Sequence, residues 1–309
     1  MAKQSHATGL LLPSREALLW ADSDLAFLIE AARHAENAGF DSVWAGDSLL
    51  ARPRGEPLTL LAGVAGATTR VSLGTAVLLP LLRHPISLAH ALATLDLIAK
   101  GRVIVGIGPG AELPGTHAEL GALGVPSDRR VGAMVNAVER ARRLWRNEEP
   151  GLELLPRPFR PGGPPIWVGG TGPRMLRLTG EKFDGWLPLS PTPAHYASGL
   201  RAVHEAAERA GRDPDSIATG VYLTVAVAGS AREAAGELDA YMKAYYGVPA
   251  EVMAKSMALH AGTMESAADW FAAYRAAGAH HLVVRLARPG LSDYNETVEE
   301  IFSAARSRV

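Results

Sequence analysis

The chain has 309 residues, of which 48% are hydrophobic and 20% charged, enough for one large α/β barrel domain or two ordinary domains. Its formal net charge of −1 comes from interspersed acidic and basic residues, so nucleic acid and membrane surfaces are not expected partners. The absence of cysteine excludes disulfides, thiolate metal sites and cysteine nucleophiles. The first residues, MAKQSHATG, lack an apolar signal core, and no run of about 18 apolar residues occurs, so we expect a cytoplasmic protein.

Short apolar segments alternate with amphipathic segments along the whole sequence. In chain order, the segments that predict strands are residues 8–12, 40–45, 71–79, 103–107, 166–168, 184–189, 217–228 and 281–286. The segments that predict helices are residues 25–39, 57–69, 84–100, 128–147, 173–179, 193–211, 230–246, 264–277 and 292–307. This alternation favours a (β/α)8 TIM barrel over the alternative, a doubly wound open sheet. We expect residues 1–309 to form a single barrel domain.

The remaining segments predict loops and insertions. Residues 13–21 predict a loop, and residues 22–24, Asp22-Ser23-Asp24, offer caps for the first helix. Residues 111–127 form a Gly-rich loop long enough to be a functional lip. Residues 147–165 carry six prolines, which is typical of an extended insertion and not of a helix. Residues 246–263 are interpreted either as a mobile lid or as a helical cap packed on the barrel.

Residues 70–110 form one strand–helix–strand unit in the middle of this pattern. Its first strand, Val71–Leu79, is apolar on both faces, which is typical of a parallel sheet that is covered on both sides. Its second strand ends before Gly108-Pro109-Gly110, and parallel sheets bind ligands at the carboxyl ends of their strands. Gly108 and Gly110 are therefore candidate ligand-binding residues.

A set of short motifs occurs in a fixed order within this unit. They are Gly74-Thr75-Ala76-Val77, Pro80, His84-Pro85, Ala93-Thr94-Leu95-Asp96, Gly101-Arg102 and Gly106-x-Gly108-x-Gly110. In order and spacing they resemble the bacterial luciferase-like monooxygenase family, which includes deazaflavin-dependent dehydrogenases and reductases. The resemblance implies a TIM barrel that binds a reduced flavin-type ring, with Thr75, Ala76 and Val77 among the cofactor-binding residues. It also implies a non-proline cis peptide at Ala76-Val77 that bulges against the ring, although nothing in these two residues demands one.

Glycines also follow the predicted strand at residues 166–168, in the segment Gly169-Gly170-Thr171-Gly172. Glycines let the backbone approach a ligand, and the positive end of the next helix dipole faces an anion there. The segment therefore predicts either a phosphate site for a cofactor or a tight turn, and the resemblance favours the phosphate site. Ser190 and Arg285 also stand at predicted strand ends. Ser190 is a candidate cofactor contact, and Arg285 either meets an anionic group or closes a salt bridge.

Asp47 and Ser48 follow the second predicted strand. Asp47 is interpreted either as a polar contact or proton-handling group, or as a helix cap or salt-bridge partner of Arg52 or Arg54. In the deazaflavin-dependent sugar-phosphate dehydrogenases of the family, a catalytic histidine follows this aspartate, and here Ser48 stands in its place. Ala111 likewise replaces the glutamate that those enzymes carry after the glycine motif. Asp47 and Ser48 stay catalytic candidates, but the acid–base group is left unassigned.

The resemblance implies an oxidoreductase and leaves its cofactor open. The first hypothesis is an FMN-dependent monooxygenase for a small organic substrate, supplied with reduced FMN by a separate flavin reductase. The alternatives are a hydride-transfer reductase or dehydrogenase that uses the deazaflavin coenzyme, and a non-catalytic flavin-binding protein. An isomerase or aldolase is disfavoured because no lysine stands at a predicted strand end. A homodimer that pairs through the apolar second and third helices is expected, and no histidine pattern has the spacing of a metal site.

Overall fold

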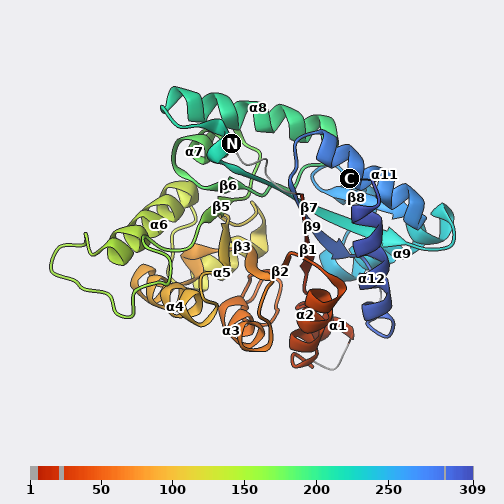
Figure 1. Cartoon of the computed structure of the whole chain (residues 1–309), viewed down its shortest axis with the longest axis horizontal. Helices are drawn as coiled ribbons and strands as arrows, with labels where there is room; N and C mark the ends of the chain where they lie inside the picture. Colours follow the sequence, from red (N-terminus) through yellow and green to blue (C-terminus); the bar gives the residue numbers. More distant parts are fainter. Residues whose placement is uncertain (1–5, 21–23, 289, 309) are drawn as a thin grey trace.

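Strands and helices alternate in the computed structural model, which describes residues 6–20, 24–288 and 290–308 (Figure 1). The strands are β1 (Ala7–Leu11), β2 (Ser42–Ala45), β3 (Ser72–Leu78), β4 (Val103–Ile107), β5 (Ile166–Val168), β6 (Gly185–Trp186), β7 (Ala218–Val227), β8 (Ala258–Gly262) and β9 (His281–Leu286). The α-helices are α1 (Glu16–Trp20), α2 (Phe27–Ala38), α3 (Pro57–Ala67), α4 (Pro85–Ile98), α5 (Pro114–Ala122), α6 (Arg130–Arg146), α7 (Pro173–Lys182), α8 (Pro193–Arg209), α9 (Ala231–Tyr246), α10 (Ala250–Met253), α11 (Met264–Ala276) and α12 (Tyr294–Arg306). Two 3₁₀ turns lie at Pro80–Leu82 and Pro214–Ser216.

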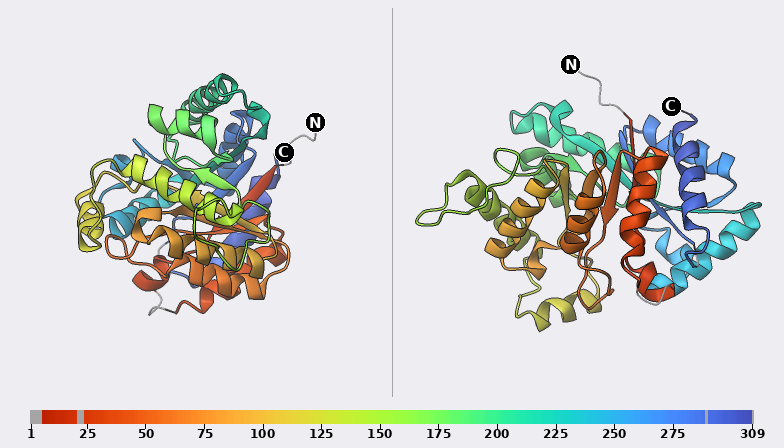
Figure 2. Two further views of the ribbon diagram at one scale, coloured as in Figure 1. Left: turned by 90° about the vertical axis from the view of Figure 1, so that its left-hand side faces the viewer. Right: turned by 60° about the horizontal axis from the view of Figure 1, so that its bottom comes forward.

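The strands close into a ring. Strands β1 to β6 pair with their neighbours in order, β6 pairs with β7, β7 with β9, and β9 with β1. All of these pairings are parallel. Helices surround the strands on the outside, as the views of Figure 1 and Figure 2 agree in showing. The predicted TIM barrel is confirmed, and the open-sheet alternative is wrong.

Strand β8 lies beside the ring, and the sequence pattern does not predict it. The ten residues of β7 reach beyond β6, so that Ala218 and Thr219 pair with β6 while Leu223–Val227 pair with β8. The interpretation of residues 246–263 as a lid or helical cap is therefore wrong for its second part, and the first part holds the short helix α10. The segment becomes a strand because β7 offers it a free edge, and not because of a strong local pattern.

Two segments expected as loops contain helices. Helix α1 lies within residues 13–21, where the buried carboxylate of Glu16 accepts a hydrogen bond from the hydroxyl of Tyr241. Helix α5 lies within residues 111–127 and buries Glu119 against the barrel. Both loop predictions are wrong because contacts with residues far along the chain stabilise these short helices, which local sequence patterns do not reveal.

The other predicted boundaries fit more closely. Asp24 Oδ1 accepts hydrogen bonds of 3.0 and 3.3 Å from the N–H groups of Ala26 and Phe27, although Ala26 occupies the N-cap position of α2; Asp22 and Ser23 lie outside the described residues. The strand predicted at residues 184–189 is shorter, because β6 pairs through only Gly185 and Trp186. In the described chain, the proline-rich segment 147–165 contains neither helix nor strand, as predicted.

A cluster of large side chains fills the inside of the barrel. Its buried members are Leu11, Trp44, Ala76, Trp167, Leu187 and Val283. Trp44 requires small neighbours, because a Cβ atom at Gly9 or Gly74 would lie 2.5 or 2.1 Å from the indole. The filled interior leaves the rim of the barrel, at the carboxyl ends of the strands, as the place for a ligand.

His281 lies half-buried against this cluster. Its ring lies edge-on to Trp44 and Trp167, with centroids 5.5 and 5.4 Å away, and its Nε2 lies 2.7 Å from Ser42 Oγ. Burial lowers the pKa of His281 from 6.5 to about 4. The neutral imidazole is therefore part of the folded core at neutral pH.

We expect His281 to make the protein less stable in acid. Between pH 6.5 and pH 4 the unfolded chain binds a proton at this histidine and the folded chain does not. The free energy of unfolding should therefore fall by about 3 kcal/mol as the pH is lowered through this range. Urea unfolding monitored by tryptophan fluorescence at several pH values would measure it. His281→Gln should lose this slope and the exposed control His90→Gln should keep it; equal slopes in all three proteins would contradict the assignment.

Candidate active site

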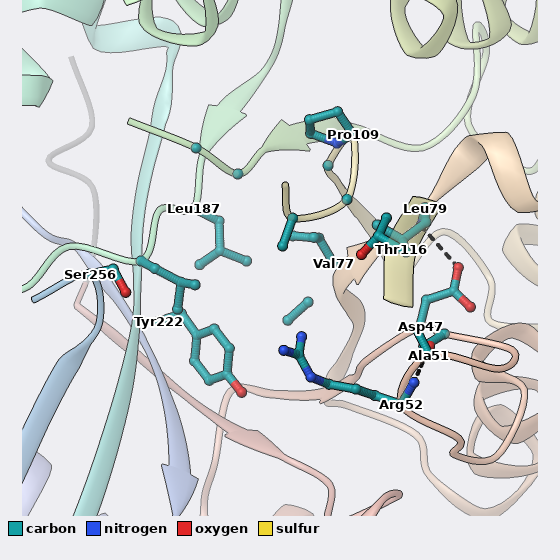
Figure 3. A pocket seen from close by; sticks show the side chains of 18 of the residues that line it. Asp47, Ala51, Arg52, Val77, Leu79, Pro109, Thr116, Leu187, Tyr222 and Ser256 are labelled. Carbon is teal, nitrogen blue, oxygen red and sulfur yellow. Dashed lines mark hydrogen bonds between the residues drawn. The ribbon is translucent and has the colours of Figure 1, made fainter. Parts of the chain in front are cut away.

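A cavity of about 410 Å³ lies at the carboxyl ends of the strands (Figure 3). Its wall is built from the loop after β2, the end of β3, the loop after β4 with α5, the loop after β5, and tyrosines of β7 and α9. These segments are far apart in the sequence and meet only because the ring of strands closes. A site at this rim is where β/α barrels bind ligands and carry out catalysis.

Most of the residues proposed from the sequence line this cavity. They are Asp47, Ser48, Ala76, Val77, Gly108, Gly110, Gly169, Gly170 and Thr171. Three others, Thr75, Gly172 and Ser190, are not part of its lining. Thr75 donates its hydroxyl to the carbonyl of Gly106 at 2.8 Å, and Gly172 is the residue before the first turn of α7. Ser190 Oγ forms a hydrogen bond with His195 Nδ1 at 2.7 Å, so the hydroxyls of Thr75 and Ser190 are both engaged outside the cavity.

The Ala76-Val77 peptide bond is cis, as the family resemblance implies. The register between β3 and β4 shifts at this point, between Thr75 and Leu78, so the segment bulges from the strand. In Figure 3 the side chains of Val77 and Leu187 point into the cavity from neighbouring walls. Glycine is needed next to the bulge, because a Cβ atom at Gly108 would lie 2.9 Å from Val77 Cγ2.

Asp47 is held by an ion-pair network and not by the residues expected from the sequence. Its side chain is fully buried, and it accepts hydrogen bonds from the Leu79 N–H at 2.9 Å and from both Nη atoms of Arg83 at 2.6 and 3.1 Å. Arg83 also donates to Glu56 at 2.6 Å. The proposed salt bridges from Asp47 to Arg52 or Arg54 are therefore wrong, and Arg83 is the partner. With its oxygens occupied in this way, Asp47 holds the loop in place and is poorly placed to move a proton.

Ser48 is likewise occupied by a group that the sequence did not suggest. Its hydroxyl donates to Glu119 Oε1 at 3.1 Å and accepts from the Arg52 N–H at 2.9 Å. The same carboxylate oxygen accepts from the N–H groups of Leu49, Leu50 and Ala51. Glu119 therefore joins α5 to the loop after β2 and shapes the cavity. A buried glutamate on a helix inside a predicted loop leaves no local signal, which is why sequence reasoning missed it.

The glycine-rich turn after β5 exposes backbone donors at the cavity wall. Gly170 has a φ of 113°, a conformation that favours glycine, and its carbonyl accepts from Trp186 Nε1 at 2.9 Å. The N–H groups of residues 170–172 have no acceptor among the described residues. They precede the first turn of α7, which has no side-chain cap. This arrangement suits an anion such as a phosphate.

The opposite side of the cavity is lined by arginine and tyrosine. Arg52, Arg54, Tyr222, Tyr245 and Tyr246 contribute here. Figure 3 shows the guanidinium group of Arg52 extending into the cavity toward the ring of Tyr222. Burial raises the pKa of Tyr222 and of Tyr245, so these phenols stay neutral. Sequence reasoning named none of these tyrosines as site residues, because they come from β7 and the end of α9.

Arg285 lies behind these tyrosines and is only 1% exposed. It donates to Thr224 Oγ1 at 3.2 Å and to the Tyr246 hydroxyl at 2.8 Å, and four tyrosine rings surround its guanidinium group. Its Nη2 has no hydrogen-bond partner among the described residues. The salt-bridge interpretation of Arg285 is wrong, because its partners in the described chain are the hydroxyls of Thr224 and Tyr246; contact with an anionic group stays a prediction, although Arg285 does not line the cavity.

Neither a metal site nor a membrane-spanning helix occurs in the described part of the chain. No cluster of three or more His, Asp or Glu side chains is arranged to hold a metal ion in the described part of the chain. Among the helices in residues 6–20, 24–288 and 290–308, none has the length and apolar character needed to span a membrane.

Comparison with known proteins supports the family resemblance. The sequence profile of the luciferase-like monooxygenases matches residues 7–281. A phthiodiolone/phenolphthiodiolone dimycocerosates ketoreductase of Mycobacterium tuberculosis is 37% identical over 216 residues, 58% of this chain and 55% of that protein. A hydroxymycolic acid dehydrogenase of Mycobacterium tuberculosis, described as dependent on coenzyme F420, is 33% identical over 228 residues, 69% of this chain and 62% of that protein. This chain thus spans little more than half the length of the curated relatives it matches.

Solved structures share the whole fold at lower sequence identity. A secondary alcohol dehydrogenase, solved with an adduct of coenzyme F420 and acetone, has a TM-score of 0.81 at 22% identity and covers 98% of this chain and 99% of its own. The oxygenating constituent of 3,6-diketocamphane monooxygenase from Pseudomonas putida, solved with FMN, has a TM-score of 0.79 at 20% identity and covers 99% of both chains. At this level of identity the likeness establishes the fold alone.

Proposed function

The chain belongs to the luciferase-like monooxygenase family, and we propose that it is an oxidoreductase that uses the deazaflavin coenzyme, which is coenzyme F420, to interconvert a carbonyl compound and an alcohol. The observation that carries the choice is that relatives above 30% identity are named as a ketoreductase and as a dehydrogenase dependent on this coenzyme. The FMN-dependent monooxygenase, the first hypothesis from the sequence, becomes the alternative. Only that alternative needs a separate flavin reductase as a partner.

The residues of the cavity fit a flavin-type ring. Ala76, Val77 and Leu187 give an apolar wall on which a planar ring packs, and the volume of about 410 Å³ lies in the range of cofactor and ligand sites. The free N–H groups of residues 170–172 suit the phosphate of the same molecule. When bound, the reduced deazaflavin supplies a hydride to a carbonyl carbon. The protein orients the substrate and excludes water.

When a hydride adds to the carbonyl carbon, the π electron pair of the C=O bond moves to the oxygen, which then needs a proton, and Tyr246 is the proposed donor. Tyr246 lines the cavity, and its hydroxyl accepts a hydrogen bond from Arg285 at 2.8 Å, so its own O–H proton is not used in that bond. The positive charge of Arg285 stabilises the negative charge left on the oxygen after proton transfer. Tyr246 thus takes the acid–base role that Asp47 and Ser48, both occupied in the wall, do not fill.

The location and oligomeric state of the protein are also matters of proposal. We propose a cytoplasmic homodimer of single barrel domains that pairs through α3 and α4. Leu97 and Ile98 at the end of α4 are 38% and 47% exposed, which leaves apolar surface for a partner.

Binding of the reduced cofactor tests the proposed function. We expect the purified protein to bind the reduced deazaflavin coenzyme at least tenfold more tightly than reduced FMN, as measured by equilibrium dialysis under anaerobic conditions. Gly108→Ala should weaken this binding by about tenfold, because its Cβ displaces Val77 from the wall. Gly66→Ala is the matched control, since its Cβ meets no atom within 4 Å. Preference for FMN would favour the monooxygenase, and binding of neither ring would contradict both.

A further inference from the structure

The two arginines that line the tyrosine side of the cavity have no carboxylate as a direct partner in the described chain. Arg52 and Arg54 both line the cavity and both come from the loop after β2. Apart from the bond that Arg54 Nε donates to the Arg52 carbonyl at 3.3 Å, their guanidinium groups have no hydrogen-bond acceptor among the described residues. Neither forms an ion pair with a carboxylate in the described chain. Taking such groups out of water is costly unless an anion joins them.

The nearby carboxylates are already engaged elsewhere. Asp47 and Glu56 both pair with Arg83. Glu119 is held by Ser48 and backbone N–H groups, and Glu16 accepts from the hydroxyl of Tyr241. The phenols of Tyr222, Tyr241 and Tyr245 do not supply negative charge either, because burial raises their pKa. Half-buried Arg15 and buried Arg285 also lie against these tyrosine rings, so four arginines share this side of the cavity, and the charge of Glu16, whose partner Tyr241 is neutral, offsets only part of theirs.

The two guanidinium groups are also fixed in position. Arg52 stacks on the ring of Tyr246 with its central carbon 4.8 Å from the ring centroid. Arg54 occupies the space beside Gly46, where a Cβ atom would lie 2.1 Å from its Nη1. Glycine at position 46 thus makes room for this arginine at the cavity wall, next to the carbonyl of Ala76. Two planar donors held in this way suit the paired oxygens of a carboxylate or phosphate.

We propose that Arg52 and Arg54 form an anion subsite that selects substrates carrying a carboxylate or phosphate close to the carbon that reacts. This inference rests on the proposed function and specifies its substrate class. The anion belongs to the substrate and not to the cofactor, because the backbone donors for a cofactor phosphate come from the turn after β5. In Figure 3 Arg52 lies across the cavity from Pro109 and close to Tyr222. An anion bound by Arg52 holds the substrate beside Tyr246, the proposed proton donor.

Calorimetric titration of the coenzyme-free protein tests the subsite directly. The probes are phenylglyoxylate and its methyl ester, which share a ketone and differ by one negative charge, together with inorganic phosphate. We expect the acid to bind at least tenfold more tightly than the ester and to be displaced by phosphate. Arg52→Met and Arg54→Met should each weaken binding of the acid by about tenfold to a hundredfold and leave the ester unchanged. Arg33→Met, at an exposed arginine of α2, is the control and should change neither.

Two further measurements separate the possible failures. Thermal unfolding of Arg52→Met and Arg54→Met should occur at or above the wild-type temperature, because each change removes an unpaired charge; a fall would assign the arginines a structural role and overturn the subsite. Both variants should bind the reduced deazaflavin coenzyme as the wild type does, and a loss of that binding would place the coenzyme's own anion here. Equal affinity for acid and ester would also overturn the inference. Failure of the wild type to bind either reduced ring would instead contradict the proposed function.

Discussion

Replacing Arg83 with methionine is expected to lower the free energy of unfolding by about 3–5 kcal/mol, because the change leaves the carboxylate of Asp47 buried without its counter-ion. Arg83 supplies two of the hydrogen bonds to Asp47, and the Leu79 N–H alone remains after the substitution. The side chain of Asp47 is fully buried, so water does not replace the lost donors. Urea unfolding of Arg83→Met at neutral pH, followed by tryptophan fluorescence, would measure the loss.

A double-mutant cycle separates the contribution of the Asp47–Arg83 ion pair to the free energy of unfolding from the effect of the changed side-chain shape. Asp47→Asn in the Arg83→Met background should recover part of the stability, because a neutral amide is less costly to bury than an unpaired carboxylate. Arg33→Met removes an exposed ion pair with Glu30 and should cost less than about 1 kcal/mol. If Arg83→Met cost no more than this surface control, Asp47 would be free of the network and open again to a role in proton transfer.

The barrel was largely predictable because its signals are local. Strands such as β3 and β4 are apolar on both faces, and some helices, such as α2 and α9, end at a glycine in the left-handed conformation, so these elements can be predicted from their own residues. The wrong predictions for α1 and β8 have one cause, which is that each element depends on contacts with distant parts of the chain. Helix α1 depends on the contact of Glu16 with Tyr241, and β8 depends on the free edge of β7, so neither element follows from its own sequence.

The candidate site was predictable where it is built from backbone. Glycine at positions 108, 169 and 170 marks places where a chain turns or another group comes close, and the cis bond at Ala76-Val77 came from the family resemblance alone. The partners of the polar side chains were not predictable in the same way. Arg83 is 36 residues from Asp47, and Glu119 is 71 residues from Ser48, so only the fold brings each pair together.

The positive charge on the tyrosine side of the cavity could not be predicted either, because it also depends on which residues the fold brings together. The sequence shows Arg52 and Arg54 close to Asp47, which suggests that the charges neutralise one another. In the folded protein Asp47 instead forms an ion pair with Arg83, and Arg52 and Arg54 line the cavity without a carboxylate partner in the described chain. A pairing that looks complete in the sequence therefore becomes a surplus of positive charge in the folded protein, and this surplus is what points to an acidic substrate.

Tyr246 ends α9 and is the group on which the proposed reaction depends most directly. Replacing it with phenylalanine removes the hydroxyl and keeps the ring on which Arg52 stacks. We expect kcat for ketone reduction by the reduced deazaflavin to fall by about 10²–10⁴-fold, the usual contribution of a positioned proton donor. KM should change little, because the guanidinium groups that hold the substrate anion remain in place. Steady-state kinetics with phenylglyoxylate would measure both constants.

Tyr245→Phe is the matched control for this prediction. Tyr245 also lines the cavity, but no hydrogen bond links its hydroxyl to a charged group of the described chain, whereas the hydroxyl of Tyr246 accepts from Arg285 at 2.8 Å. The control should therefore keep kcat within about threefold of the wild type. Coenzyme binding and the free energy of unfolding should be measured for both variants, since the loss of an acceptor for buried Arg285 also affects the fold. If Tyr246→Phe retained its coenzyme and its kcat matched that of Tyr245→Phe, the proton would have to come from another group or from water.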